Sequence, residues 1–132
     1  MKSRSKNRDK IINSLKKDYR WNSQVHFLKE NHKVKASWFG IPMILDKKYV
    51  LTKNKILSRM SKGGVENRPI ISGNFTLQPS VKKYNLVKKG EKFNNVNLIH
   101  KLGFFIGLSV NQINGKKLNR FKNIFFKSFN NL

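Results

Sequence analysis

Short apolar segments, separated by glycine, proline and polar residues, limit the size of any sheet that this chain can form. Three of them, at 37–45, 65–71 and 103–108, are typical of buried strands, and a shorter one lies at 25–28. Pro42 falls inside the first segment and cannot donate to a β-ladder, which favours an edge position or a bulge there. A doubly wound domain needs more strands than these, so the sequence predicts a small sheet.

The segments between these strands have helical periodicity. Four helices are expected from apolar residues spaced three and four apart, at about 9–19, 52–62, 94–101 and 112–129. Thr52 is placed to cap the second helix, and the glycine pair at 63–64 is placed to end it. Residues 72–92 have the composition of a loop. We therefore predict an α+β fold in which helices cover a small sheet over residues 9–129, after a basic, frayed N-terminus at 1–8.

The net charge of +23 is the strongest compositional signal. One interpretation is an anionic partner, such as nucleic acid, a membrane surface or a phosphorylated ligand. The other is mutational bias: 23 Lys stand against 6 Arg and are accompanied by 17 Asn, as an AT-rich genome would encode. Specific recognition of phosphates and bases favours Arg, so the charge alone does not assign a function.

Several classes of site are not expected in this chain. The sequence has no cysteine, which excludes disulfides and cysteine-based zinc sites and agrees with a cytoplasmic protein. No apolar run approaches the roughly 18 residues of a spanning helix. His26 and His32 lack the spacing of metal ligands, and no two acidic residues form an acid–base pair. Neither a nucleophile elbow nor a phosphate-binding glycine loop is present, so we predict no metal site and no catalytic residue.

One segment between the second and third expected strands has the residue types of a ligand site. Arg68 offers a guanidinium fork for phosphate or carboxylate oxygens, Gly73 permits close approach of a ligand, and Asn74 can both donate and accept. The alternative is that Arg68 pairs with Glu66 and that the glycine and asparagine form a simple turn. His100 on the third expected helix either faces a ligand cleft or caps and packs.

Three blocks of sequence carry a resemblance to a known family. They are Ser37-Trp38-Phe39-Gly40-Ile41-Pro42, then Val65-Glu66 with Arg68-Pro69-Ile70 and Gly73-Asn74-Phe75-Thr76, then Ile99-His100 with Gly103-Phe104-Phe105-Ile106-Gly107. In this order they resemble the C-terminal subdomain of the DegT/DnrJ/EryC1/StrS sugar aminotransferase family. They look most like its branch of GDP-4-keto-6-deoxymannose 3-dehydratases and CDP-sugar 3-dehydrases. The middle block is the most specific.

The resemblance implies the small C-terminal subdomain of an aspartate-aminotransferase-like fold, the fold of pyridoxal-phosphate-dependent transferases. The large domain that binds pyridoxal or pyridoxamine 5'-phosphate would precede residue 1, so we expect this chain alone to bind neither. The implied ligand is a nucleotide sugar linked to GDP, CDP or dTDP, with Arg68, Gly73, Asn74 and His100 as its contacts. A separate chain that carries the large domain, or a homodimer, is then the expected partner.

The predicted function is therefore that of a fragment or split part of a nucleotide-sugar aminotransferase or 3-dehydratase in deoxysugar or lipopolysaccharide O-antigen biosynthesis, inactive alone. At Leu108 and Ser109 the chain departs from dehydratase-like relatives, which tend to have Asn and His there. Two alternatives stay open: a small basic nucleic-acid-binding protein, and a non-functional truncated frame.

An isolated small domain also has an apolar face that the rest of the enzyme would cover. Trp38, Phe39, Phe104 and Phe105 are the residues expected to form such an exposed patch. The sequence therefore predicts self-association or a partner chain.

Overall fold

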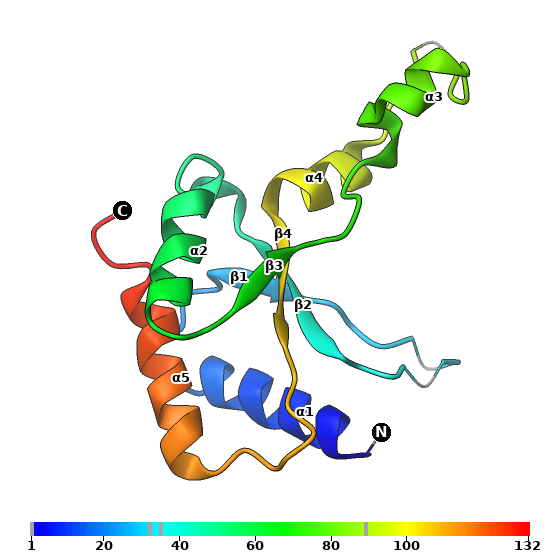
Figure 1. The fold of residues 1–132 in the computed structure, drawn as a ribbon. Helices are drawn as coiled ribbons and strands as arrows, with labels where there is room; N and C mark the ends of the chain where they lie inside the picture. Colours follow the sequence, from blue (N-terminus) through cyan, green and yellow to red (C-terminus); the bar gives the residue numbers. More distant parts are fainter. Residues whose placement is uncertain (1, 32, 35, 89) are drawn as a thin grey trace.

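A four-stranded antiparallel sheet lies at the centre of the structure, a computed structural model that describes residues 2–31, 33–34, 36–88 and 90–132 (Figure 1). Its strands are β1 (Val25–Phe27), β2 (Gly40–Leu45), β3 (Asn67–Pro69) and β4 (Gly103–Gly107), in the spatial order β1-β2-β4-β3. The helices are α1 (Lys2–Lys16), α2 (Lys53–Lys62), α3 (Pro79–Lys83), α4 (Asn94–Leu102) and α5 (Gly115–Lys127), with 3-10 turns η1 (Lys47–Tyr49) and η2 (Phe75–Leu77). The predicted α+β class and small sheet are confirmed.

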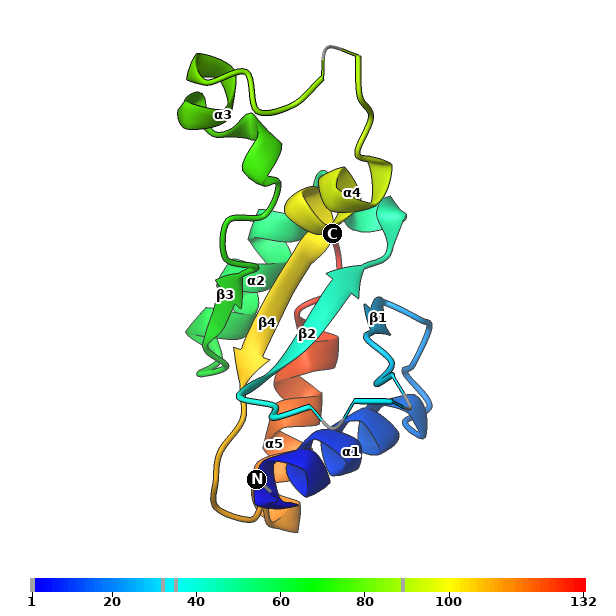
Figure 2. The same ribbon diagram turned by 90° about the vertical axis from the view of Figure 1, so that its right-hand side faces the viewer.

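The pairing of β2 with β4 forms the core. Ile41 lies opposite Ile106 and Met43 lies opposite Phe104, and each of these four side chains is at most 3% exposed. Because side chains alternate along a strand, both pairs point to the same face of the sheet. In Figure 2 the helices α2 and α5 lie behind β2, β3 and β4. The helices α1, α2 and α5 contribute buried apolar residues to this core: Ile11, Ile12, Leu15, Ile56, Met60, Phe125 and Phe126.

The opposite face of the sheet is only partly covered. Pro42 and Phe105, which are paired across β2 and β4, are half-buried there. Phe39 is 61% exposed and packs edge-to-face on Phe105, with 5.3 Å between the ring centroids. The sequence predicted an exposed patch of Trp38, Phe39, Phe104 and Phe105. That prediction is wrong for Phe104, which is fully buried because it points to the helix-covered face.

The sequence predicted an edge position or a bulge at Pro42. That prediction is wrong, because Pro42 lies in β2, a central strand of the sheet. The N–H of Leu108 donates to the carbonyl of Phe39 at 2.9 Å. Hydrogen-bonded pairs alternate along an antiparallel ladder, so the pair of Pro42 with Phe105 is one that exchanges no hydrogen bonds. On the other side of β2, β1 pairs only with residues 43–45, so this ladder stops one residue short of Pro42. The missing N–H therefore costs neither ladder a hydrogen bond.

The N-terminal segment also differs from the prediction. Residues 2–8 belong to α1 and are helical, not frayed. Asn7 is 2% exposed, and its amide nitrogen donates to the carbonyls of Ser109 and Asn111 at 2.9 and 2.8 Å. Its amide oxygen accepts from the N–H of Ile113 at 3.1 Å. One side chain thus holds the segment before α5 against α1, a long-range contact that local periodicity does not reveal.

Two further boundaries were predicted wrongly. Tyr19, expected on the buried face of the first helix, is 93% exposed because α1 ends at Lys16. The expected loop at 72–92 contains η2 and the short helix α3. Pro79 is the first residue of α3, where its fixed backbone angle suits a helix start and its missing N–H is not needed.

Asp18 links the end of α1 to α5. Its carboxylate accepts two hydrogen bonds from the guanidinium of Arg20, at 2.8 and 3.0 Å, and lies 3.2 Å from the ammonium of Lys122. The Asp18 side chain is only 5% exposed. The guanidinium of Arg20 holds the pKa of Asp18 well below its usual range, although burial acts in the opposite direction. This carboxylate is therefore charged throughout the neutral range and stabilises the fold there.

Asp18→Asn is expected to lower stability near neutral pH by an amount that shrinks as the pH falls. A lowered pKa in the folded state means that the stabilisation is complete above the unfolded pKa of about 3.9 and disappears as the pH falls toward the folded value. Urea unfolding at several pH values between about 7 and about 3 measures the gap between wild type and variant. Asp9→Asn, at an exposed acid on α1, is the control. A gap that stays constant with pH would contradict the prediction.

Candidate functional site

The loop after β3 meets the second half of α4 and brings together three of the four predicted site residues: Gly73, Asn74 and His100. The backbone N–H of Asn74 donates to Nδ1 of His100 at 3.2 Å. A nitrogen that accepts carries no proton, so the proton of the neutral ring is on Nε2. His100 is an exposed residue. The loop therefore fixes the ring in one tautomer, with Nε2 as its donor.

Asn74 is the centre of this hydrogen-bond network. Its side-chain nitrogen donates to Oδ1 of Asn97 on α4 at 2.6 Å. Its side-chain oxygen accepts from both the N–H and the hydroxyl of Thr76, at 2.9 and 2.6 Å, and caps η2. Asn74 is only 2% exposed, and its amide is occupied within the protein. Its place in the structure is that of a residue that positions the loop against α4.

Gly73 is required by both its backbone angle and its surroundings. Its φ is +49°, in the left-handed region, and the preceding Ser72 has a φ of +63°. A Cβ atom at Gly73 would lie 2.3 Å from Nδ1 of His100. Only a residue without a side chain allows the loop to pass so close to the imidazole. The close approach that the sequence suggested for a ligand is made to His100.

Arg68 stands apart from this network. It lies on β3, its side chain is 68% exposed, and its Nε and Nη2 donate to one carboxylate oxygen of Glu66 at 3.0 and 2.7 Å. This pairing is one of the two alternatives that the sequence predicted for Arg68. No hydrogen bond within the described part of the chain joins Arg68 to Asn74 or His100. The ion pair uses two of the five N–H donors of the guanidinium, so three remain for a ligand.

Two members of the network were not predicted. Asn97 and Thr76 complete the hydrogen bonds of the Asn74 amide. The signal for Asn97 was its position three residues before His100, which places both side chains on one face of α4. Thr76 stands two residues after Asn74, the spacing of an Asx-type turn, in which an asparagine side chain bonds the backbone two residues on.

A shallow apolar hollow of about 390 Å³ lies on the open face of the sheet beside this loop. The chain leaves β3 through Ile70 and Ile71, which line the hollow, and then enters the turn at Gly73. The remaining lining residues are Ala36, Ser37, Trp38, Phe39, Gly40, Pro42 and Phe105. None of them is charged, so the hollow suits an apolar partner surface and not a phosphate.

The residues that line this hollow do not fit pyridoxal phosphate. The hollow contains no lysine, histidine or carboxylate. Burial lowers the pKa of Lys53, but its ammonium already donates to the carbonyl of Gly103 at 3.0 Å. The groups that the loop offers, His100 and Arg68, can bind polar or anionic atoms.

The predictions about a histidine metal pair and about a spanning helix concern residues that the structure describes only in part. His32, one of the two histidines considered as a metal pair, lies outside the described residues. His26 lies 3.6 Å from Asp46, and no group of three or more His, Asp or Glu is placed to hold a metal ion within the described ranges. None of the described helices is long and apolar enough to cross a bilayer.

Asn74→Ala is expected to cost roughly 1–3 kcal/mol of stability, because it leaves the half-buried amide of Asn97 and the N–H of Thr76 without partners. Urea unfolding measures this loss. The NMR signals of the His100 ring should shift in the same variant, because the loop no longer fixes Nδ1. The matched control is Asn95→Ala, at an exposed amide on the same helix. Equal stability of the two variants would argue against the network.

Comparison with known proteins gives relatives of one kind. No protein-family model matches the sequence. The GDP-4-keto-6-deoxy-D-mannose 3-dehydratases of Escherichia coli O55:H7 and Yersinia pseudotuberculosis are each 31% identical to this chain over 72 residues. The aligned region is 54% of this chain, but only 19% and 18% of those two proteins. The chain thus matches about a fifth of the length of these relatives.

Solved structures show the same likeness over more of the chain. The E. coli GDP-4-keto-6-deoxy-D-mannose-3-dehydratase with bound hydrated PLP superposes with a TM-score of 0.76 at 22% identity, over 94% of this chain and 30% of that one. A variant of a GDP-4-keto-6-deoxymannose-3-dehydratase with bound GDP-perosamine gives the same values. At this identity the superposition shows a shared fold. The relatives of this chain in sequence and structure are thus GDP-4-keto-6-deoxymannose 3-dehydratases, matched over a C-terminal part of their length, which confirms the resemblance predicted from the three sequence blocks.

Proposed function

We propose that this chain is the small C-terminal domain, over residues 9–129, of a pyridoxal-phosphate-dependent nucleotide-sugar 3-dehydratase or aminotransferase. It forms one wall of the substrate cleft, in deoxysugar or O-antigen biosynthesis. The observation that carries the proposal is the superposition of 94% of the chain on one part of a 3-dehydratase. The fixed loop at Gly73 and Asn74, with His100 beside it, supports the same role. The absence of cysteine supports a cytoplasmic location.

The substrate class proposed is a nucleotide sugar, as in the relative that holds GDP-perosamine. Glu66 fixes the guanidinium of Arg68 through a single carboxylate oxygen. The remaining N–H donors of Arg68 point away from that pair and suit the oxygens of a diphosphate. Nε2 of His100 adds a neutral donor that suits a hydroxyl or carbonyl of the sugar. Arg68 and His100 are thus the residues proposed to contact substrate, and Gly73 and Asn74 the residues that position the loop.

The cofactor is proposed to be held by a different part of the enzyme. Pyridoxal phosphate, when bound, supplies the electron sink that stabilises a carbanion next to the reacting carbon. The residues of this chain contribute binding and orientation of the sugar. The cofactor-binding part either belongs to the same polypeptide or is a separate chain.

The apolar hollow is the surface on which we place the rest of the enzyme. Its lining residues include Trp38, Phe39 and Phe105, with no charged group among them. An uncharged, aromatic surface within a protein of net charge +23 is the place where a partner can dock without desolvating ammonium groups. A large domain of the same enzyme suits this surface better than a second copy of the chain, whose charge repels it.

A chimera tests the proposal. This chain replaces the matching segment of the E. coli 3-dehydratase, and turnover of GDP-4-keto-6-deoxymannose is measured. The chimera is expected to be active, and Arg68→Ala is expected to reduce its kcat/KM by about 10- to 100-fold, the value of one charge-assisted hydrogen bond. The matched control is Arg120→Ala, at an exposed arginine on α5, which should change kcat/KM less than about twofold.

Two outcomes oppose the proposal. A chimera that shows the absorbance band of bound cofactor but no turnover, with Arg68 intact, argues against a role in the substrate cleft. A stoichiometric Schiff base between pyridoxal phosphate and this chain alone argues that the chain carries its own cofactor site. We expect no such band for the isolated chain.

A further inference from the structure

The helices α2 and α5 carry basic side chains and no acidic ones. Their sequences, Lys53–Lys62 and Gly115–Lys127, contain neither Asp nor Glu. The cations of the two helices are Lys53, Lys55, Arg59, Lys62, Lys116, Lys117, Arg120, Lys122 and Lys127. The cations of these two helices can act together only if the helices form one surface.

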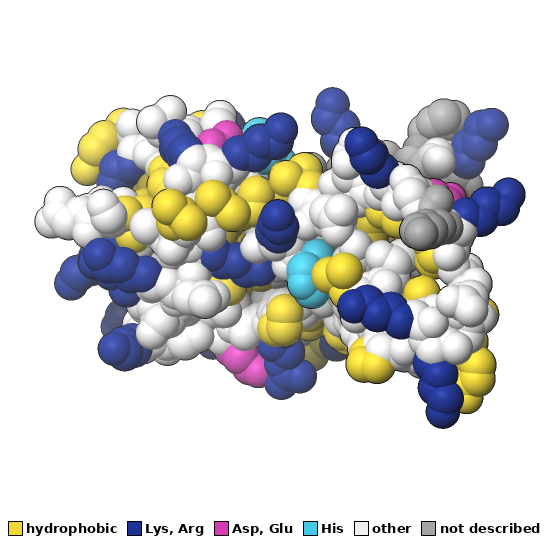
Figure 3. Space-filling view, turned by 90° about the horizontal axis from the view of Figure 1, so that it is seen from above, with side chains coloured by type: hydrophobic (Ala, Val, Ile, Leu, Met, Phe, Trp, Pro, Cys, Tyr) yellow, Lys and Arg dark blue, Asp and Glu magenta, His cyan; other side chains and the backbone are white. Residues whose placement is uncertain are grey.

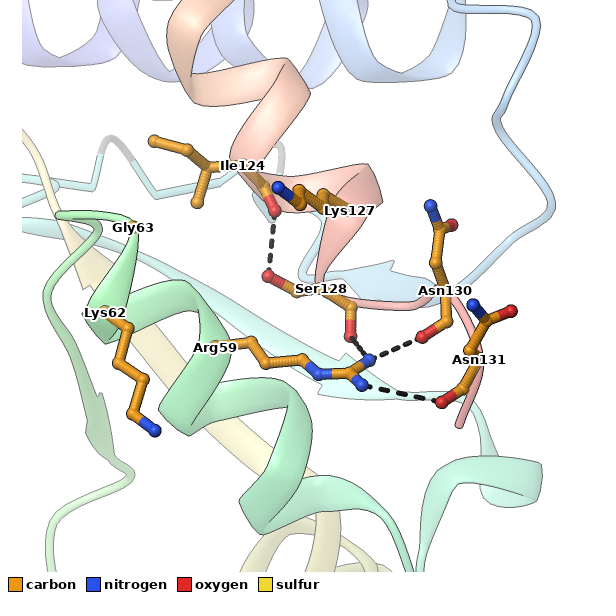
Figure 4. A pocket seen from close by; sticks show the side chains of 8 residues that line it. All are labelled: Arg59, Lys62, Gly63, Ile124, Lys127, Ser128, Asn130 and Asn131. Carbon is orange, nitrogen blue, oxygen red and sulfur yellow. Dashed lines mark hydrogen bonds between the residues drawn. The ribbon is translucent and has the colours of Figure 1, made fainter.

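The two helices lie side by side with a groove between them. A Cβ atom at Gly63, where α2 ends, would lie 2.6 Å from Cγ2 of Ile124 on α5. Arg59 reaches across from α2 and donates to the carbonyls of Ser128, Asn130 and Asn131 at the end of α5 (Figure 4). The groove has a volume of about 580 Å³, and Lys62 and Lys127 line it. Arg120 lies beside it, against Gly64.

Among the described residues, an ion pair neutralises only one cation of this surface. The ion pairs of Lys and Arg in the described part of the chain join Asp9 to Arg8, Glu66 to Arg68, and Asp18 to Arg20 and Lys122. Lys122 is thus the one cation of α2 and α5 that forms an ion pair among the described residues. Lys53, Lys55 and Arg59 donate to backbone carbonyls. The exposed cations left for a ligand are Lys62, Lys116, Lys117, Arg120 and Lys127.

The residue types on this surface indicate which class of polyanion it can bind. A helix that lies in a membrane surface inserts large apolar side chains, and proteins that stack on single-stranded bases use exposed aromatic residues. None of the exposed large hydrophobic residues of the described chain belongs to α2 or α5. The polar groups that line the groove and face solvent are the ammonium groups of Lys62 and Lys127 and the side-chain amides of Asn130 and Asn131, and such groups are partners of phosphate oxygens.

We propose that the face formed by α2 and α5 binds the phosphate backbone of double-stranded nucleic acid without reading its sequence. Lysine-rich contacts of this kind act through charge and release of counterions, so they give affinity without base discrimination. The surface is separate from the loop at Gly73 and His100. It does not depend on the nucleotide-sugar function, and either proposal can fail alone.

Because other regions of the protein are also basic, a test must show that nucleic acid binds at α2 and α5 and not elsewhere on the surface. Figure 3 shows Lys and Arg side chains spread over the face that it views. Any protein of net charge +23 attracts polyanions at low salt, so binding by itself proves little. The proposal requires that removal of charges from α2 and α5 weakens binding more than removal of equal charge elsewhere.

The experiment compares two triple variants with the wild-type chain. The site variant carries Lys62→Gln, Arg120→Gln and Lys127→Gln. The matched variant carries Lys82→Gln, Lys92→Gln and Lys101→Gln, at exposed lysines on or next to α3 and α4. Fluorescence anisotropy with a labelled duplex of about 20 base pairs, at salt concentrations from about 50 to about 200 mM, gives the affinity and its salt slope. Thermal melting verifies that all three proteins are folded.

The site variant is expected to lose at least about tenfold in affinity, and its salt slope should fall by about 2–3 units, close to 0.9 for each phosphate contact. The matched variant should lose less than about threefold. Equal losses in the two variants, or none, overturn the proposal, because the charge is then diffuse. Tighter binding to phosphatidylserine vesicles than to the duplex also overturns it. If the site variant does not fold, the exposed pair Lys116→Gln and Lys117→Gln replaces it, with Lys82→Gln and Lys92→Gln as its control.

Discussion

The antiparallel pairing of β2 with β4 is the contact on which the rest of the structure depends. It joins segments about 60 residues apart in the sequence and presents Ile41, Met43, Phe104 and Ile106 together to α1, α2 and α5. The edge strand β3 is attached through β4, and the edge strand β1 through β2. Because β4 follows α4 directly, the same pairing sets where α4 stands, and therefore where His100 meets the loop after β3. The candidate site thus inherits its geometry from the core.

The site is built from hydrogen bonds to backbone and amide groups more than from charge. Asn74 fixes the loop to α4, and Gly73 lets it approach His100. This arrangement holds the His100 ring in one orientation, and Arg68 on the neighbouring strand carries a positive charge. Such a division suits a domain that holds and orients a substrate whose chemistry is carried out by groups on another part of an enzyme.

The elements of the fold could be predicted from the sequence where local patterns determine them. The helix that begins after Thr52 and ends at Gly63, and the strand at Gly103, were placed within one or two residues. The errors concern long-range contacts. Pro42 is tolerated in a central strand because β1 ends before it, and residues 2–8 are helical because the amide of Asn7 is buried against the segment before α5. Gly73, Asn74 and His100 were predicted from the sequence as candidate site residues, but their contact with one another, and the part of Asn97, depend on the three-dimensional path of the loop.

The high net charge opposes contact between copies of the chain through the open face of the sheet. A face with Phe39 exposed and Pro42 and Phe105 half-covered favours contact between copies of the chain. Mutual repulsion between molecules of charge +23 opposes that contact. The balance depends on the solvent, because dissolved salt shortens the reach of the repulsion to about 10 Å at 0.1 M and leaves apolar attraction intact. We therefore expect ionic strength to govern the colloidal behaviour of the isolated chain, with the repulsion dominant in dilute buffer and the apolar attraction of the open face dominant in concentrated salt.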